Sequence, residues 1–162
     1  MPRLTIVDGY NVIRRDPALA RMERQSLESA REALVRRLAT DARLRKDEVT
    51  VVFDGGKGGL AFEHSERRGC VRLIFSRFGE TADEVIKRLV NAASGEVRVI
   101  SNDRELRDHT ARQGGTPVRV VPRPRYYAPR EDEEDTPQRS SKKGPARREK
   151  KRRRQPDPYW SP

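Results

Sequence analysis

Four short apolar segments of this chain each lead into acidic or amide side chains. In chain order they are Leu4–Val7 before Asp8, Val49–Phe53 before Asp54, Val71–Phe75 with a short connection to Glu80 and Asp83, and Val97–Ile100 before Asn102 and Asp103. Short apolar runs bounded by turn residues are typical of buried strands. Because the carboxyl ends of parallel strands meet at one edge of an open sheet, where ligands bind, we expect these polar side chains to lie together.

Helical patterns separate the strands and indicate the class of fold. The expected helices run from Pro17 to about Met22, from Ser26 along an apolar stripe that includes Leu34 and Leu38, from Thr81 through Ala93, and from Asn102 or Asp103 to about Gln113, before a fifth strand at Val118–Val121. Pro at a first helical position and apolar residues spaced by three and four support these assignments. Alternating strands and helices predict an α/β fold with a mainly parallel sheet.

Several carboxylates gathered at one edge would repel one another and raise each other's pKa values. A divalent cation relieves that repulsion, and Mg²⁺ prefers oxygen ligands, keeps several waters and is usually bound together with substrate phosphates. Each acid alone also has an ordinary structural explanation, as a turn residue or a helix cap. Their convergence on one predicted edge favours metal-assisted phosphodiester chemistry.

Composition changes near Pro122 and predicts two regions. Residues 1–121 are about 40% apolar and can bury a modest core, whereas residues 122–162 contain only 6 apolar side chains in 41. This composition predicts that the second region is a disordered, Pro/Arg-rich charged tail. Its net charge is +6 and that of residues 1–121 is +5, so both regions are basic. Arginine-rich tails commonly bind RNA, and a solvated tail without a partner is the alternative.

Other features narrow the class of protein. The single cysteine, Cys70, excludes an internal disulfide, and we expect it to be a small buried hydrophobe. His64 in a polar loop and His109 in a helix lie away from the acids, which argues against histidine-based acid–base chemistry. Neither a membrane span nor a signal peptide is recognisable, so we expect a cytoplasmic protein without a membrane partner.

The polar blocks together resemble a known family. Asp8-Gly9-Tyr10-Asn11, Asp54-Gly55, Thr81-Ala82-Asp83 and Ser101-Asn102-Asp103, in this order and spacing over residues 3–121, resemble the YacP-like branch of the NYN domains, relatives of the PIN and FLAP nucleases. The resemblance implies a PIN-like three-layer α/β/α sandwich and an endoribonuclease that uses Mg²⁺ or Mn²⁺. It also implies RNA as the partner, with mRNA on translating ribosomes as the substrate.

The resemblance assigns roles residue by residue. It gives Asp8, Asn11, Asp83 and Asp103 as catalytic residues, with the three aspartates as metal ligands, and gives supporting roles to Asp54, Glu80 and Asn102. Basic residues close in sequence to the predicted edge are candidates for contacts with the RNA backbone: Arg14, Arg15, Lys57 and Arg104. For Lys57, in the glycine-rich segment after Asp54, a solvated loop lysine is the alternative.

Two other functions are compatible with parts of the pattern. An inert RNA- or ribosome-binding module would use the basic residues and would bind in a salt-dependent, chelator-independent way. A phosphoacceptor receiver domain also has aspartates at strand ends, but it needs a lysine after the fifth strand, and Pro122-Arg123 follows that strand here.

Overall fold

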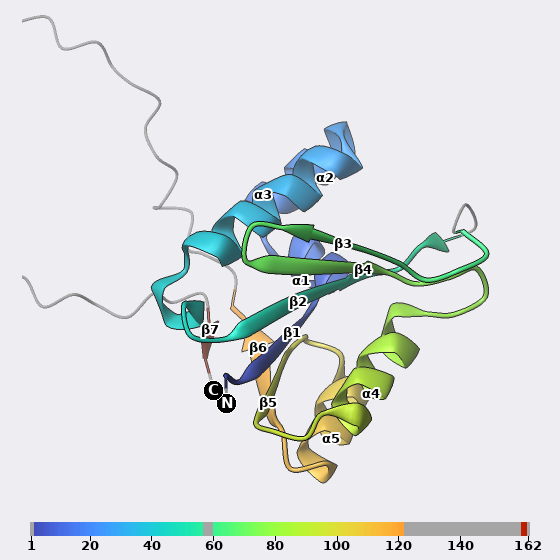
Figure 1. The fold of residues 1–162 in the computed structure, drawn as a ribbon. Coiled ribbons are helices and arrows are strands. Elements are labelled where there is room, and N and C mark those ends of the chain that lie inside the picture. Colours follow the sequence, from blue (N-terminus) through green and yellow to red (C-terminus); the bar gives the residue numbers. More distant parts are fainter. Residues whose placement is uncertain (1, 57–59, 122–159, 162) are drawn as a thin grey trace, which may run out of the picture. The chain divides into compact units, whose positions relative to one another are not determined.

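The computed structural model describes residues 2–56, 60–121 and 160–161. Strands and helices alternate along most of the chain, as Figure 1 shows. The strands are β1 (Leu4–Asp8), β2 (Glu48–Phe53), β3 (His64–Arg68), β4 (Val71–Phe75), β5 (Val97–Ile100), β6 (Thr116–Val120) and β7 (Trp160–Ser161). The helices are α1 (Gly9–Arg15), α2 (Pro17–Gln25), α3 (Leu27–Thr40), the 3₁₀ turn η1 (Ala42–Leu44), α4 (Ala82–Ala92) and α5 (Arg104–Arg112).

The strands form a sheet in the order β3-β4-β2-β1-β5-β6-β7. All four pairings among β4, β2, β1, β5 and β6 are parallel, whereas β3 and β7 pair antiparallel at the two edges. The predicted mainly parallel α/β fold is therefore confirmed, and its five expected strands all form. The two edge strands were not expected.

Helices cover both faces of the sheet, because successive residues of a buried strand point to opposite sides. Val7, Val51 and Leu73 belong to the apolar cluster that packs against α1, α2 and α3. Their neighbours Ile6, Val52 and Ile74 belong to the cluster that packs against α4 and α5. The α1–α3 and α4–α5 layers lie on opposite sides of the sheet in Figure 1, so the expected three-layer sandwich is confirmed.

The first helix, α1, begins directly after β1, where the sequence pattern predicted no helix. The carboxylate of Asp8 caps it by accepting from the Asn11 backbone N–H at 3.4 Å. Gly9 lies against the ring of Phe53, and a Cβ atom at this position would overlap that ring. The glycine is therefore required because the helix starts in contact with a neighbouring strand, an interaction that no local pattern reveals.

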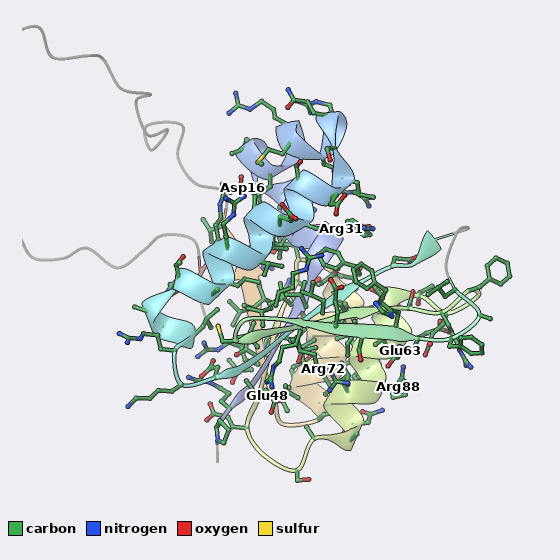
Figure 2. All side chains as sticks on the ribbon, turned by 45° about the horizontal axis from the view of Figure 1, so that its top comes forward. Asp16, Arg31, Glu48, Glu63, Arg72 and Arg88 are labelled. Atoms are coloured by element: carbon green, nitrogen blue, oxygen red, sulfur yellow. The ribbon has the colours of Figure 1, made fainter. Side chains whose placement is uncertain are left out.

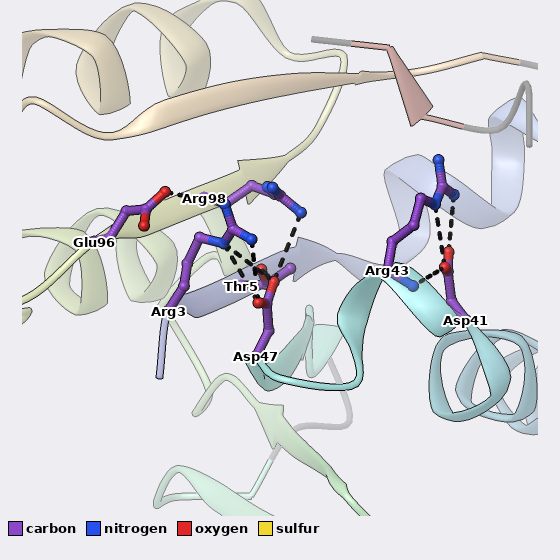
Figure 3. Close-up of polar contacts among 7 residues, drawn as sticks. All are labelled: Arg3, Thr5, Asp41, Arg43, Asp47, Glu96 and Arg98. Carbon is purple, nitrogen blue, oxygen red and sulfur yellow. Dashed lines mark hydrogen bonds and ion pairs between the residues drawn. The ribbon is translucent and has the colours of Figure 1, made fainter. Parts of the chain in front are cut away.

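At the amino ends of the strands, one buried carboxylate is neutralised by two arginines (Figure 3). Asp47, whose side chain is 2% exposed, accepts from the Thr5 hydroxyl at 2.6 Å and from Arg3 Nε at 3.4 Å. Arg98 Nη1 lies 3.6 Å from the same carboxylate, and Arg3 also contacts Glu96 at 3.0 Å. This cluster, here called the Asp47 cluster, joins the loop before β2 to β1 and β5.

Three local expectations were wrong or reach beyond the described residues. Cys70 is exposed, because it occupies the turn between β3 and β4 and the buried run begins only at Val71. His64 begins β3, whose residues are mostly exposed and polar and so give no strand periodicity. Of the predicted tail, residues 122–159 and 162 lie outside the described residues, and Val120 pairs with Trp160 of β7.

Among the described helices, none is long and apolar enough to cross a membrane.

Candidate active site

A cleft of about 500 Å³ opens at the carboxyl edge of the sheet, where the sequence predicts the acids to meet. β1, α1, the end of β2 and the start of α4 supply its lining. The lining residues are Asp8, Tyr10, Asn11, Arg14, Arg15, Asp54, Thr81, Ala82 and Asp83. Three predicted acids thus share one cleft although they are 46 and 29 residues apart along the chain.

Asp8 is the most buried acid of this edge, with 7% of the residue exposed. Its Oδ2 accepts from the Ser101 hydroxyl at 2.8 Å, and its Oδ1 caps α1. Burial is the main cause that raises the pKa of Asp8 to about 6, and the charges of Asp83 and Asp103 raise it further. The two hydrogen bonds act in the opposite direction but only partly offset these effects.

Asp83 lies in the first turn of α4, which begins at a capping box formed by Thr81 and Glu84. Partial burial raises the pKa of Asp83, and the negative charges of Asp103, Glu105 and Asp54 add to that effect. Lys87, one turn further along the helix, acts in the opposite direction. Neighbouring acids therefore lie close enough to Asp8 and Asp83 to disfavour the ionisation of these two carboxyls, as the predicted convergence implied.

Asp103 is not among the residues that line the cleft, although its charge acts on Asp8 and Asp83, and a hydrogen-bonded turn holds it. Its Oδ1 caps α5 by accepting from Leu106 N–H at 2.9 Å. Its own N–H donates to Ser101 Oγ at 3.0 Å, and that hydroxyl in turn donates to Asp8. Ser101, which is fully buried, thus connects two of the predicted metal ligands. The prediction did not include Ser101 among the site residues, although a small hydroxyl residue directly after a buried strand was a usable signal.

The two predicted amides have different structural roles. Asn11 lines the cleft, and its Oδ1 accepts from the backbone N–H of Asn102 at 2.9 Å, which ties α1 to the turn after β5. The Asn102 side chain pairs instead with the backbone of Val120: its Nδ2 donates to the carbonyl at 3.1 Å and its Oδ1 accepts from the N–H at 2.7 Å. Asn102 therefore holds the end of β6 rather than lining the cleft.

The remaining predicted residues divide between the cleft and its surroundings. Asp54 lines the cleft and accepts from Gly56 N–H at 2.7 Å, whereas Glu80 forms ion pairs with Arg77 and Arg88, both at 3.3 Å. Of the four basic candidates, Arg14 and Arg15 line the cleft, and Arg104 is 91% exposed and lies 3.7 Å from Asp108. Lys57 lies outside the described residues.

Tyr10 also lines the cleft, although it was not among the predicted site residues. The Tyr10 ring lies 5.1 Å from that of Phe53, and its hydroxyl accepts from Arg31 Nε at 3.0 Å. The Arg31 guanidinium also lies over the rings of Phe53 and Phe75, at 5.4 and 5.1 Å. Figure 2 shows Arg31 between α3 and the sheet. Arg31 comes 21 residues after Tyr10, so sequence spacing alone gave no sign of this contact.

The chemistry of the cleft fits a hard divalent cation. Within the described residues, no three His, Cys, Asp or Glu side chains form a ready-made metal site. Mg²⁺ does not require one, since it commonly uses one or two carboxylates together with waters and substrate phosphates. Asp8 and Asp83 have raised pKa values partly because of neighbouring negative charge, and a bound cation would remove that cost.

An α/β/α sandwich with acids at its carboxyl edge is the arrangement expected of a PIN-like, nuclease-like domain, and comparisons with known proteins support that class. The model of the YacP-like NYN domain matches residues 5–155, so this chain belongs to the YacP-like NYN domain family. The match extends beyond residue 121, where we expected the resemblance to end.

The chain is also similar to a protein of Bacillus subtilis. YacP of strain 168 is 34% identical over 104 residues, which make up 62% of this chain and 60% of the relative. The crystal structure of Rae1 (YacP) from this organism has a TM-score of 0.57 and 28% identity, and that of its W164L mutant a TM-score of 0.59 and 29% identity. The matches cover 72% of this chain and 68% and 69% of those chains.

Proposed function

We propose that this protein is a divalent-metal-dependent endoribonuclease whose active site is the acidic cleft. The observation that carries the proposal is the convergence of Asp8, Asp83 and Asp103, whose charges act on one another at the carboxyl edge of a nuclease-like fold. Membership of the NYN family and a net charge of +11 support a polyanionic substrate. By the same resemblance, the substrate is mRNA on translating ribosomes.

In this proposal the aspartates bind the metal, and an amide and two arginines contact the RNA. Asp8 and Asp83, which line the cleft, would hold Mg²⁺ or Mn²⁺ together with waters and substrate phosphates, with Asp103 as the third proposed ligand. The ion, when bound, would activate water and offset the charge of the attacked phosphate. Asn11 can donate a hydrogen bond from Nδ2 to a phosphate oxygen, because its Oδ1 is already occupied by Asn102 N–H. Arg14 and Arg15 contact the neighbouring phosphates from the α1 side of the cleft.

The test is cleavage of end-labelled single-stranded RNA in Mn²⁺, Mg²⁺ or EDTA. Wild type should cut internally with metal and not with EDTA, and Asp8→Asn should lower the cleavage rate at least about 100-fold while remaining folded. Asp108→Asn, which changes an exposed acid outside the cleft, is the matched control and should cleave like wild type. Full activity of Asp8→Asn would overturn the assignment of the site.

A second measurement follows the metal without following cleavage. Added Mg²⁺ should raise the melting temperature of wild type, because a ligand that binds only the folded state stabilises it. The shift should shrink in Asp8→Asn and Asp83→Asn. RNA binding that persists in EDTA, without cleavage in any metal and without a Mg²⁺-dependent shift, would instead favour the inert RNA-binding module.

A further inference from the structure

Three apolar side chains beside the cleft are largely exposed. The exposed fractions are 78% for Phe62, 64% for Phe78 and 60% for Leu60. A folded protein does not gain stability from rings left in water, and grouped exposed apolar side chains commonly mark an interaction site. We call these three residues the Phe62–Phe78 patch.

The patch is built on two neighbouring connections. Leu60 and Phe62 lie between β2 and β3, and Phe78 lies between β4 and α4. The backbone N–H of Phe78 donates to the carbonyl of Leu60 at 2.9 Å, which joins the two connections. Figure 1 shows the two connections side by side beyond the ends of β2 and β4.

The same connections begin and end in the cleft. The first starts at Asp54 and the second ends at Thr81, and both residues line the cleft. The hydroxyl of Ser76 accepts from Gly55 N–H at 3.0 Å and so holds the two connections together near the cleft. Phe78 is three residues from Thr81, a span of at most about 11 Å, so a strand bound in the cleft reaches the patch within a few nucleotides.

Among the described residues, the charged side chains that flank the patch form ion pairs with one another. Arg88 forms ion pairs with Glu63 and Glu80, and Arg77 pairs with Glu80; Figure 2 shows Glu63 and Arg88 together. Exposed rings among paired charges suit the flat faces of nucleobases, while Arg14 and Arg15 in the cleft suit phosphates. Three side chains are also far fewer than the roughly 20–30 residues per side of a stable protein interface.

We propose that Phe62 and Phe78 form a stacking platform for unpaired RNA bases next to the acidic cleft, an inference that rests on the proposed function in taking RNA as the ligand. The platform makes the protein prefer single-stranded RNA, because the bases of a duplex are already stacked on one another. Phe62 and Phe78 thereby position the strand whose phosphodiester bond enters the cleft.

The test measures binding of a labelled 12-nucleotide single-stranded RNA, its duplex, and an abasic oligomer of equal length to the full chain in EDTA. The double variant Phe62→Ala/Phe78→Ala should bind the single strand about 10- to 100-fold more weakly. Phe62→Tyr/Phe78→Tyr should bind like wild type, because the rings are kept. Leu27→Ala, which truncates another exposed apolar side chain, is the matched control and should also bind like wild type.

Further binding measurements distinguish base stacking from general apolar contact with the RNA. The abasic oligomer should bind wild type as weakly as the single strand binds the alanine variant. Phe62→Leu/Phe78→Leu should also bind weakly, and unchanged binding would overturn the stacking platform in favour of general apolar contact with the RNA. Phe78→Trp combined with Trp160→Phe, which removes the chain's single tryptophan, should lose fluorescence when RNA is added.

The outcomes distinguish this inference from the proposed function. Wild-type affinity in the folded alanine variant overturns the platform, whatever the cleavage assay shows. Loss of affinity in that variant, with no cleavage of RNA by wild type in any metal, supports the platform and overturns only the nuclease. Absence of RNA binding by wild type in EDTA overturns the platform, and absence of cleavage in any metal as well overturns both. Melting curves check folding, and they should change little because both rings are mostly exposed.

Discussion

The two ends of the sheet carry buried aspartates in opposite electrostatic settings. At the amino edge, Asp47 is surrounded by Arg3, Arg98 and the Thr5 hydroxyl. At the carboxyl edge, Asp8 has one hydroxyl and one backbone N–H as donors and faces the charges of two further acids. Both are buried carboxylates, yet only the Asp47 carboxylate has its charge balanced by neighbouring cations.

This difference indicates which of the two acids stabilises the fold and which one is the candidate for binding a ligand. A carboxylate with paired cations contributes to folding, and breaking the pair leaves uncompensated charge. A carboxylate whose neighbours disfavour its ionisation costs free energy in the absence of a ligand, and groups of this kind cluster at functional sites. Substitutions of these two aspartates should therefore have opposite effects on stability.

The largest expected effect is at the amino edge. Asp47→Ala should lower the free energy of unfolding by about 2–4 kcal/mol, because Arg3 and Arg98 lose their shared partner. The value is below that of a fully buried pair, since both arginine side chains are partly exposed. Urea denaturation at pH 7 measures it, and a loss below 0.5 kcal/mol would show that the Asp47 cluster is not structural.

The second largest expected effect is a gain in stability, and it concerns Asp8 at the carboxyl edge. In EDTA at pH 7–8, Asp8→Asn should raise the free energy of unfolding by about 1–3 kcal/mol. The folded-state pKa of Asp8, about 6, lies above its ordinary value of 3.8, so between these values the folded state holds more protons than the unfolded state. Stability conferred by protonated Asp8 is therefore lost as pH rises through this range, and asparagine avoids that loss.

Denaturation curves from pH 3.5 to 8 measure this dependence. The difference between Asp8→Asn and wild type should disappear below about pH 4, where Asp8 is protonated in both states. Asp47→Asn is the matched control, and it should destabilise the protein at pH 7. The same sign of effect for both substitutions would contradict the contrast between the two edges.

The smallest expected effect concerns Ser101, the hydrogen-bond donor to Asp8 at the carboxyl edge. Ser101→Ala should cost about 1–2 kcal/mol of stability, because it removes the bond to Asp8 and leaves the N–H of Asp103 without its acceptor. It should also raise the pKa of Asp8 further, since that bond lowers it. NMR titration of the Asp8 carboxyl carbon measures the change.

Ser76→Ala provides the matched control for this measurement. Ser76 is also buried, and its hydroxyl accepts from Gly55 N–H without contacting Asp8. Its loss should cost comparable stability and leave the Asp8 pKa unchanged. An equal shift of that pKa in both variants would mean that the hydroxyl of Ser101 has no specific effect on Asp8.

Local patterns in the sequence determined most of the fold and the position of the main acids. Five apolar strands and the helix starts at Pro17, Ser26 and Thr81 were readable because strand periodicity and capping depend on residues close in sequence. The end of each parallel strand lies at one edge by topology alone. Asp8, Asp54 and Asp83 could therefore be assigned to one place before any coordinate was known.

Tertiary structure alone decided which side chains contact these acids and which parts of the edge remain exposed. The Ser101–Asp8 bond, the contact of Gly9 with Phe53, the Arg31–Tyr10 pair and the Leu60–Phe78 backbone bond each join segments distant in sequence. Periodicity records which face of an element is buried but not which neighbour buries it. For that physical reason the sequence locates the acids, and only the packing of α1, α4 and the loops around them determines their ionisation.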